Sequence, residues 1–233
     1  MTRRWHDWYI RATVARAIAL PLSLSLLLAA ACAHAARPLA TEDAGIVPQN
    51  GVEIELGHDM TRESSLGTCH YAGAVVKTGI SERMDLGMAI PVDISSSPAW
   101  GNINVCAKLL LAKNAAAGLP LVSRFGFCPG TGDYGTTLVS GFVAGPWTFH
   151  GNAGVTVAAA DETGEALASG AVEFGLGTLS LVAEILHAGG TTEILGGVRW
   201  NAFKDIDLDA GLGTGLSDNS ASLRTAAGLT VRM

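Results

Sequence analysis

From Gly51 to the end of the chain, short segments alternate between apolar and polar residues. The alternation is clearest at 52–56, where aliphatic residues take one phase and two glutamates take the other, and it recurs at 205–212. Successive side chains of a β-strand point to opposite faces, so a period of two predicts strands. Gly, Asn, Asp, Ser and Pro separate the segments, as turns require. We predict strands at 51–59, 68–78, 84–92, 103–112, 119–127, 136–144, 147–158, 168–176, 179–187, 191–200, 206–214 and 220–233.

Twelve segments of about ten residues predict an all-β fold, an antiparallel transmembrane β-barrel over 51–233. An even number of strands brings the first and last strand ends of the chain to the same side of the membrane, as expected for a chain delivered from the periplasm. The periplasmic turns are then expected at 79–83, 113–118, 145–146, 177–178 and 201–205. The connections in the 60s, 90s, 130s, 160s and at 215–219 are expected to face outward.

Charged residues keep to one phase of these segments, and the opposite phase is aliphatic. A charge at the bilayer midplane costs about 2–4 kcal/mol, so the aliphatic phase is expected to face lipid and the charged phase the lumen. A soluble β-sandwich shows the same alternation and is the alternative for the fold. The residues predicted to line the lumen are Glu53, Glu55, Asp85, Lys108, Arg124, Glu173, Glu184, Glu193, Arg199, Asp207, Asp209 and Arg224.

The start of the chain has the pattern of an export signal. Four arginines precede an uncharged run at 17–33 rich in Leu and Ala, which ends in an A-x-A site at 33–35. We therefore predict a cleaved signal peptide at 1–35 and a place in a bacterial outer membrane. A retained membrane anchor and a lipid attachment at Cys32 are the alternatives.

Cleavage after residue 35 would leave 11 basic and 20 acidic side chains, a formal net charge of −9. Phosphate binding needs clustered Lys and Arg, so this balance argues against nucleic acid as a partner. Three cysteines would remain, Cys69, Cys106 and Cys128. An odd number cannot all pair within the chain, so free thiols are expected, with a single bridge between Cys106 and Cys128 as the alternative.

Residues 36–50 are polar and lack the strand alternation. The segment is long enough to fold back into the barrel as a plug, for which we name Arg37, Glu42 and Asp43. The two acids would complement the lumen cations Lys108, Arg124, Arg199 and Arg224.

No motif for metal, cofactor or catalysis is recognised. The acids Asp205, Asp207 and Asp209 lack the later Glu of a calcium loop, and aliphatic residues separate them. Small barrel enzymes place His near the outer rim, and the histidines to consider are His58, His70, His150 and His187. None stands in a catalytic motif, so we expect no enzyme, no metal and no cofactor.

Several segments resemble one family. Residues 36–45, followed by Gly51 and Glu53, are similar to the mature start of the outer-membrane transporter family labelled phenol meta-degradation pathway. Further similar pieces are 79–87, Trp100 and Gly101 leading to Lys108, 129–135 and 145–147. Two positions depart from the family. Glu42 stands where Asp is usual, and Met233 stands where a final aromatic is usual, so slower insertion is expected.

This resemblance implies an outer-membrane barrel with transporter or porin-like activity toward small organic, often aromatic, compounds. The expected partners are outer-membrane lipid, the barrel assembly machinery and a small organic solute. The function is therefore expected to be passage or binding of such a solute. A structural barrel without transport is the first alternative, and an enzyme at the barrel rim is the second.

Overall fold

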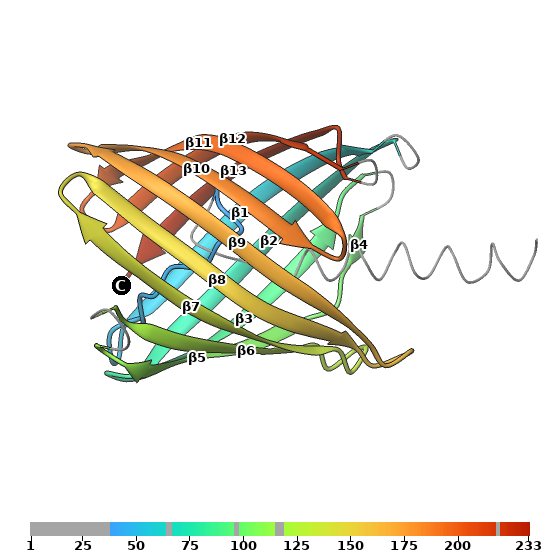
Figure 1. Cartoon of the computed structure of the whole chain (residues 1–233), viewed down its shortest axis with the longest axis horizontal. Coiled ribbons are helices and arrows are strands. Elements are labelled where there is room, and N and C mark those ends of the chain that lie inside the picture. Colours follow the sequence, from blue (N-terminus) through green and yellow to red (C-terminus); the bar gives the residue numbers. More distant parts are fainter. Residues whose placement is uncertain (1–37, 64–66, 96–97, 115–118, 218–219) are drawn as a thin grey trace, which may run out of the picture. The chain divides into compact units, whose positions relative to one another are not determined.

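The computed structural model describes residues 38–63, 67–95, 98–114, 119–217 and 220–233, which form one closed antiparallel β-barrel (Figure 1). Twelve long strands and the two-residue β4 make the wall. The strands are β1 Val52–Glu63, β2 Gly67–Ser81, β3 Met84–Asp93, β4 Ala99–Trp100, β5 Asn104–Ala112, β6 Leu121–Phe127, β7 Tyr134–Ala144, β8 Trp147–Ala158, β9 Thr163–Leu176, β10 Leu179–Ala188, β11 Thr191–Phe203, β12 Ile206–Gly215 and β13 Leu223–Arg232.

The first and last strands close the barrel. β1 pairs with β13 from Glu53 opposite Arg232 to Arg62 opposite Leu223, and β2 pairs with both β1 and β3. The backbones of Val52 and Met233 exchange hydrogen bonds of 2.9 and 2.8 Å. We call the end of the barrel where these residues lie the terminal end, and the opposite end the loop end.

Two-residue turns join strands at the terminal end, at 82–83, 145–146, 177–178 and 204–205. Gly145 and Gly177 have φ of 62° and 72° there. This left-handed conformation is readily adopted by glycine and strained for most other residues, which explains the glycine in these two turns.

The predicted barrel is confirmed, and each predicted segment overlaps one of the twelve long strands. The sandwich alternative is wrong, because the pairing of β1 with β13 leaves no open sheet. Several strand ends were predicted too short, most of all at β1, which continues to Glu63, and at β9, which begins at Thr163. There the hairpins continue as paired strands through polar sequence that carries no apolar alternation. The short β4, which pairs with Val92 and Asp93, was not predicted.

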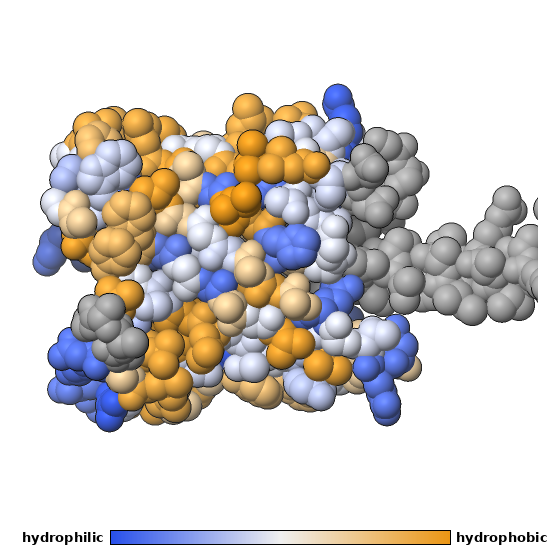
Figure 2. All heavy atoms as spheres, viewed as in Figure 1, coloured by the Kyte–Doolittle hydropathy of each residue, from blue (hydrophilic) through white to orange (hydrophobic). Residues whose placement is uncertain are grey.

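The distribution of side chains is inverted relative to a soluble protein. Large apolar residues are exposed on the outer face, and Figure 2 shows apolar residues over much of the visible side, with residues of intermediate and polar character between them. They include Leu86, Met88, Leu109, Leu181, Ile185, Val198 and Leu212. By contrast, the largest fully buried side chains include Glu55 and Asp85. An apolar outside around a polar inside is the pattern of barrels that lie in lipid.

Aromatic side chains gather near the terminal end of β7, β8 and β9. Trp147 lies 4.5 Å from Phe174 and 6.5 Å from Phe149, between ring centroids, and Phe149 stacks on Phe142 at 4.7 Å. Rings at this level fit the headgroup region of a bilayer. Among the described residues, no helix is long and apolar enough to cross a membrane.

Candidate functional site: the charged barrel interior

The residues predicted for the lumen lie on the interior phase of their strands. Seven are buried, namely Glu55, Asp85, Lys108, Glu173, Glu184, Asp207 and Asp209. The others, Glu53, Arg124, Glu193, Arg199 and Arg224, are partly exposed. Burying a charge is unfavourable unless it is paired or hydrogen-bonded, so their partners decide what the interior can do.

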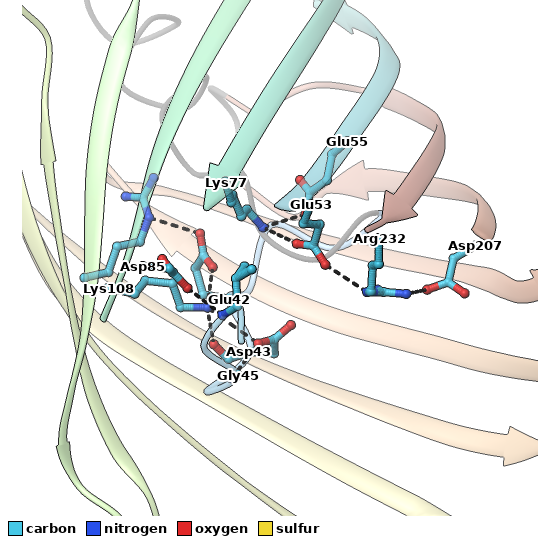
Figure 3. Close-up of polar contacts among 12 residues, drawn as sticks. Glu42, Asp43, Gly45, Glu53, Glu55, Lys77, Asp85, Lys108, Asp207 and Arg232 are labelled. Carbon is cyan, nitrogen blue, oxygen red and sulfur yellow. Dashed lines mark hydrogen bonds and ion pairs between the residues drawn. The ribbon is translucent and has the colours of Figure 1, made fainter. Parts of the chain in front are cut away.

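One group of charges crosses the barrel seam. Lys77 Nζ lies 2.6 Å from Glu55 Oε1 and 3.0 Å from Glu53 Oε1. Arg232 continues the group, with Nε 2.9 Å from Glu53 and Nη1 2.6 Å from Asp207 Oδ2 (Figure 3). Lys77 was not predicted from the sequence to line the lumen. Its place two residues after Val75, on the interior phase of a predicted strand, was the signal for it.

A second group lies on β8, β9 and β11. Glu173 accepts hydrogen bonds of 2.9 Å from Arg199 Nη1, and its Oε1 lies 3.2 Å from His150 Nε2. Toward the loop end, Arg224 contacts Asp59 at 3.4 Å and Glu193 at 3.7 Å. These cations are therefore engaged by acids of the wall itself.

Residues 38–50 precede β1 and lie inside the barrel. Val47 N donates to Asp85 Oδ2 at 2.9 Å, and Ala40 N donates to Glu184 Oε2 at 2.9 Å. Asp85 belongs to β3 and Glu184 to β10, so the segment contacts two separate parts of the wall. The chain enters past Gly79, where a Cβ would overlap the Pro48 carbonyl, so no larger residue fits at this close approach.

Glu42 is the most strongly held charge of this segment. Its buried carboxylate lies 3.0 Å from Arg124 Nε and 3.4 Å from Lys108 Nζ. With its amide oriented to satisfy both ends, Asn152 donates to the Glu42 carbonyl at 3.1 Å and accepts from Glu42 N at 2.6 Å. Lys108 also donates to the Asp43 carbonyl at 2.9 Å (Figure 3).

Four cations were expected to meet the acids of the segment, and two of them do. Lys108 and Arg124 contact Glu42, whereas Arg199 and Arg224 bind acids of the wall. Charge alone does not specify which acid lies nearest to a given cation. Arg37 and the expected signal peptide at 1–35 lie outside the described residues.

Leu39 and Thr41 contact the opposite side of the interior. Leu39, buried, packs with Ala171 of β9, Val182 of β10 and Leu195 of β11. The Thr41 backbone N–H and hydroxyl both donate to Glu184 Oε1. Glu184 thus accepts hydrogen bonds from two successive backbone amides and one hydroxyl.

The environment of Asp43 favours its ionised form. Burial alone would raise the pKa of this carboxyl. The charges of Lys108 and Lys77, with the N–H of Gly45, more than offset that effect and lower the pKa to about 2. The Asp43 side chain remains 40% exposed, so water moderates these interactions.

The histidines considered for a rim enzyme are not brought together as one site. His58 and His70 lie 3.3 Å apart, between Nε2 and Nδ1. They lie on the exterior phase of β1 and β2, beside Ala72 and Met60. His187 contacts Thr192, and His150 belongs to the interior charges.

The three cysteines of the described barrel, Cys69, Cys106 and Cys128, are free thiols.

Within the described ranges, no group of three or more His, Cys, Asp or Glu residues could hold a metal ion. The polar groups of the interior include carboxylates, ammonium and guanidinium groups, amides, hydroxyls and the imidazole of His150.

No protein-family model matches the chain, and no curated protein sequence matches it. Solved structures do. An outer membrane channel from Pseudomonas putida F1 superposes with a TM-score of 0.64 at 11% identity, covering 82% of this chain and 98% of the channel. The KdgM porin gives 0.59 at 10% identity, covering 77% and 98%. The NanC porin gives 0.54 at 9% identity, covering 77% and 98%. The chain therefore shares the closed barrel fold of outer-membrane channels, as the family resemblance implied.

Proposed function

We propose that this protein is an outer-membrane channel for small organic solutes and that residues 36–50 are its plug. The observation that carries the proposal is the segment itself. Its described part, residues 38–50, crosses a charged interior and is held there mainly by polar contacts to Glu184, Lys108, Arg124 and Asp85.

The size of the barrel supports a solute path. Side chains just fill the interior of an eight-stranded barrel, while sixteen-stranded porins leave an aqueous channel. Twelve strands enclose an intermediate space, and here a separate segment occupies part of it. A porin of the same fold has been crystallised with an oligogalacturonate, which supports an organic solute as cargo.

The outer surface supports the membrane location. Its exposed aliphatic band fits lipid, and we place the terminal end, with its short turns, in the periplasm. Insertion by the barrel assembly machinery and export by the signal at 1–35 belong to the same proposal.

The contacts of the plug permit release. Glu42 and its partners Lys108 and Arg124 are largely buried, and burying both partners of an ion pair costs desolvation that offsets much of their attraction. Water can solvate the segment and the wall once they separate, so the net docking free energy is much smaller than the number of contacts suggests. Because they are electrostatic, salt weakens those that water reaches.

Removing the plug tests the proposal. A chain without residues 37–48, which keeps 1–36 for export, should show larger single-channel conductance in planar bilayers than the intact chain. Replacing 37–48 by a Gly/Ser run of the same length should act similarly, because it retains the length and loses the contacts. Heat-modifiable migration on unboiled gels checks that each barrel has folded.

The outcomes separate the functions. Equal, readily measured conductance with and without 37–48 excludes the plug. If no folded version conducts, transport fails and the structural barrel, whose interior ion pairs serve stability, becomes the better account.

Acid should also release the plug. In the docked segment the pKa of Asp43 is lowered to about 2, against about 3.9 for a free aspartate, so its contribution is complete above pH ~4 and lost as pH falls toward 2. Allowing for partial exposure, the contribution is about 1 kcal/mol. We expect channel opening to rise reversibly as pH is lowered from about 5 to about 2.5. Asp43→Asn should open more at neutral pH and show a weaker pH dependence, whereas equal profiles would contradict this role.

A further inference from the structure

Residues 39–42 occupy the interior as a ligand would. Along four residues they present an apolar side chain, hydrogen-bond donors and a carboxylate, and the wall provides a matching group for each. We infer that this part of the wall is a solute-binding site for an organic carboxylate that also carries an apolar group and a hydroxyl. The inference rests on the proposed function, since the solute reaches the site when the plug leaves.

The cation pair selects the carboxylate. Lys108 on β5 and Arg124 on β6 are direct neighbours across the two strands. Their partner Glu42 belongs to the plug, so its departure leaves two buried cations without that carboxylate. Asp85 on β3 lies opposite Lys108, so the wall itself supplies one acid near these two cations. Two cations beside one acid leave an excess positive charge, and a second carboxylate is the group that restores the contacts of Glu42.

Glu184 selects the hydroxyl. An ionised carboxylate only accepts hydrogen bonds, and Glu184 accepts them from Ala40 N, Thr41 N and the Thr41 hydroxyl. A solute must supply O–H or N–H donors there. The same group repels a second carboxylate, so the site favours a monoanion.

The apolar side chains around Leu39 would bind the apolar group of the solute. Ala171, Val182 and Leu195 enclose Leu39 on the interior phase, which otherwise carries mainly charged and small residues. Burying a side chain the size of leucine contributes about 1.5–3 kcal/mol. A short alkyl or ring group of a solute can fill this space.

The spacing limits the size of the solute. Three steps of extended chain span at most about 10 Å, so the pocket, the acceptor and the cation pair lie within reach of one small molecule. In the segment the donors lie between the apolar side chain and the carboxylate. The matching solute has its hydroxyl between its tail and its acid group.

The plug and the solute compete for the same groups. A ligand that binds only the released state shifts the population toward it. A solute of this class should therefore promote opening, and weakening the plug should tighten solute binding by the same factor.

The test uses the full mature chain carrying Glu42→Gln, which weakens the plug and leaves the wall intact. Binding of three probes is measured by isothermal titration calorimetry in detergent: 5-hydroxyoctanoate, octanoate without the hydroxyl, and 4-octanol without the carboxylate. Empty micelles give the background from partition. We expect 5-hydroxyoctanoate to bind about fivefold more tightly than octanoate, and 4-octanol to show no saturable binding.

Wall variants in the same background locate the site. Lys108→Gln with Arg124→Gln should weaken 5-hydroxyoctanoate binding by about tenfold or more. Arg232→Gln, which removes a cation that contacts Glu53 and Asp207, is the matched control and should leave binding unchanged. Glu184→Gln should remove the preference for the hydroxyl and retain binding of octanoate. The Glu184→Gln variant keeps the inference testable if the chain carrying both Lys108→Gln and Arg124→Gln does not fold.

Equal binding of all three probes, or equal loss from Arg232→Gln and the cation-pair variant, overturns the inference. Calorimetry does not depend on conduction. Binding without conductance would therefore contradict the channel and keep the site, whereas conductance without selective binding would contradict the site and keep the channel.

Discussion

Ile185→Arg should prevent assembly of the barrel, while Glu184→Arg, one residue earlier on β10, should be tolerated. Ile185 is 51% exposed on the outer face, and Glu184 is buried in the interior. An arginine facing the middle of the bilayer costs about 2–4 kcal/mol, whereas one facing the interior meets water and carboxylates. The two positions share a depth in the membrane, so only the direction of the side chain differs.

Met88→Arg on β3 provides an independent position for this prediction. Met88 is also exposed on the outer face and should behave like Ile185. The folded fraction is read from heat-modifiable migration after refolding into lipid vesicles. Similar folded fractions for the outward and inward arginines would contradict the assignment of the two faces.

Charge reversal in the plug should open the channel, and reversal of its partners should close it again. Glu42→Lys with Asp43→Lys places two cations beside Lys108 and Arg124. Loss of about 2 kcal/mol of docking free energy corresponds to a roughly thirtyfold shift toward the open state. Single-channel open probability measures this shift.

The compensating variant makes the test specific. Adding Lys108→Glu and Arg124→Glu restores opposite charges, while Asn152 can still bind the Glu42 backbone position. Open probability should return toward that of the intact chain. If the fourfold variant is as open as the plug variant alone, the two acids do not hold the segment through these cations.

The architecture could be predicted from the sequence because the membrane imposes one rule on each strand. Lipid excludes charge, so residues such as Met88 and Asp85 must alternate between the two faces. This rule does not act on the polar ends of strands. The extension of β1 to Glu63 and the two-residue β4 were therefore not predicted.

The sequence predicts which charged residues line the interior, but not which of them contact each other. Arg124 and Arg199 look alike in sequence, yet one contacts the plug and the other Glu173. The difference arises from the barrel register, which brings β9 and β11 to either side of β10. The pocket for Leu39 was also missed, because Ala171, Val182 and Leu195 come from three strands and share no sequence pattern.

Conduction should require residues 38–50 to leave the interior. A disulfide that reversibly links this segment to the barrel wall can therefore block conduction. A Cβ at Gly211 would lie 3.1 Å from the Pro38 Cβ, which is within a few tenths of an ångström of the spacing in disulfides. Pro38→Cys with Gly211→Cys, made in a chain with Cys69, Cys106 and Cys128 replaced by Ser, should link the plug to β12 under oxidation.

Single-channel conductance is then recorded from this tethered chain before and after addition of a reductant. The oxidised, disulfide-linked chain should stay in its low-conductance state, and large openings should occur only after reduction. Large openings of equal frequency in the oxidised, cross-linked chain would contradict it.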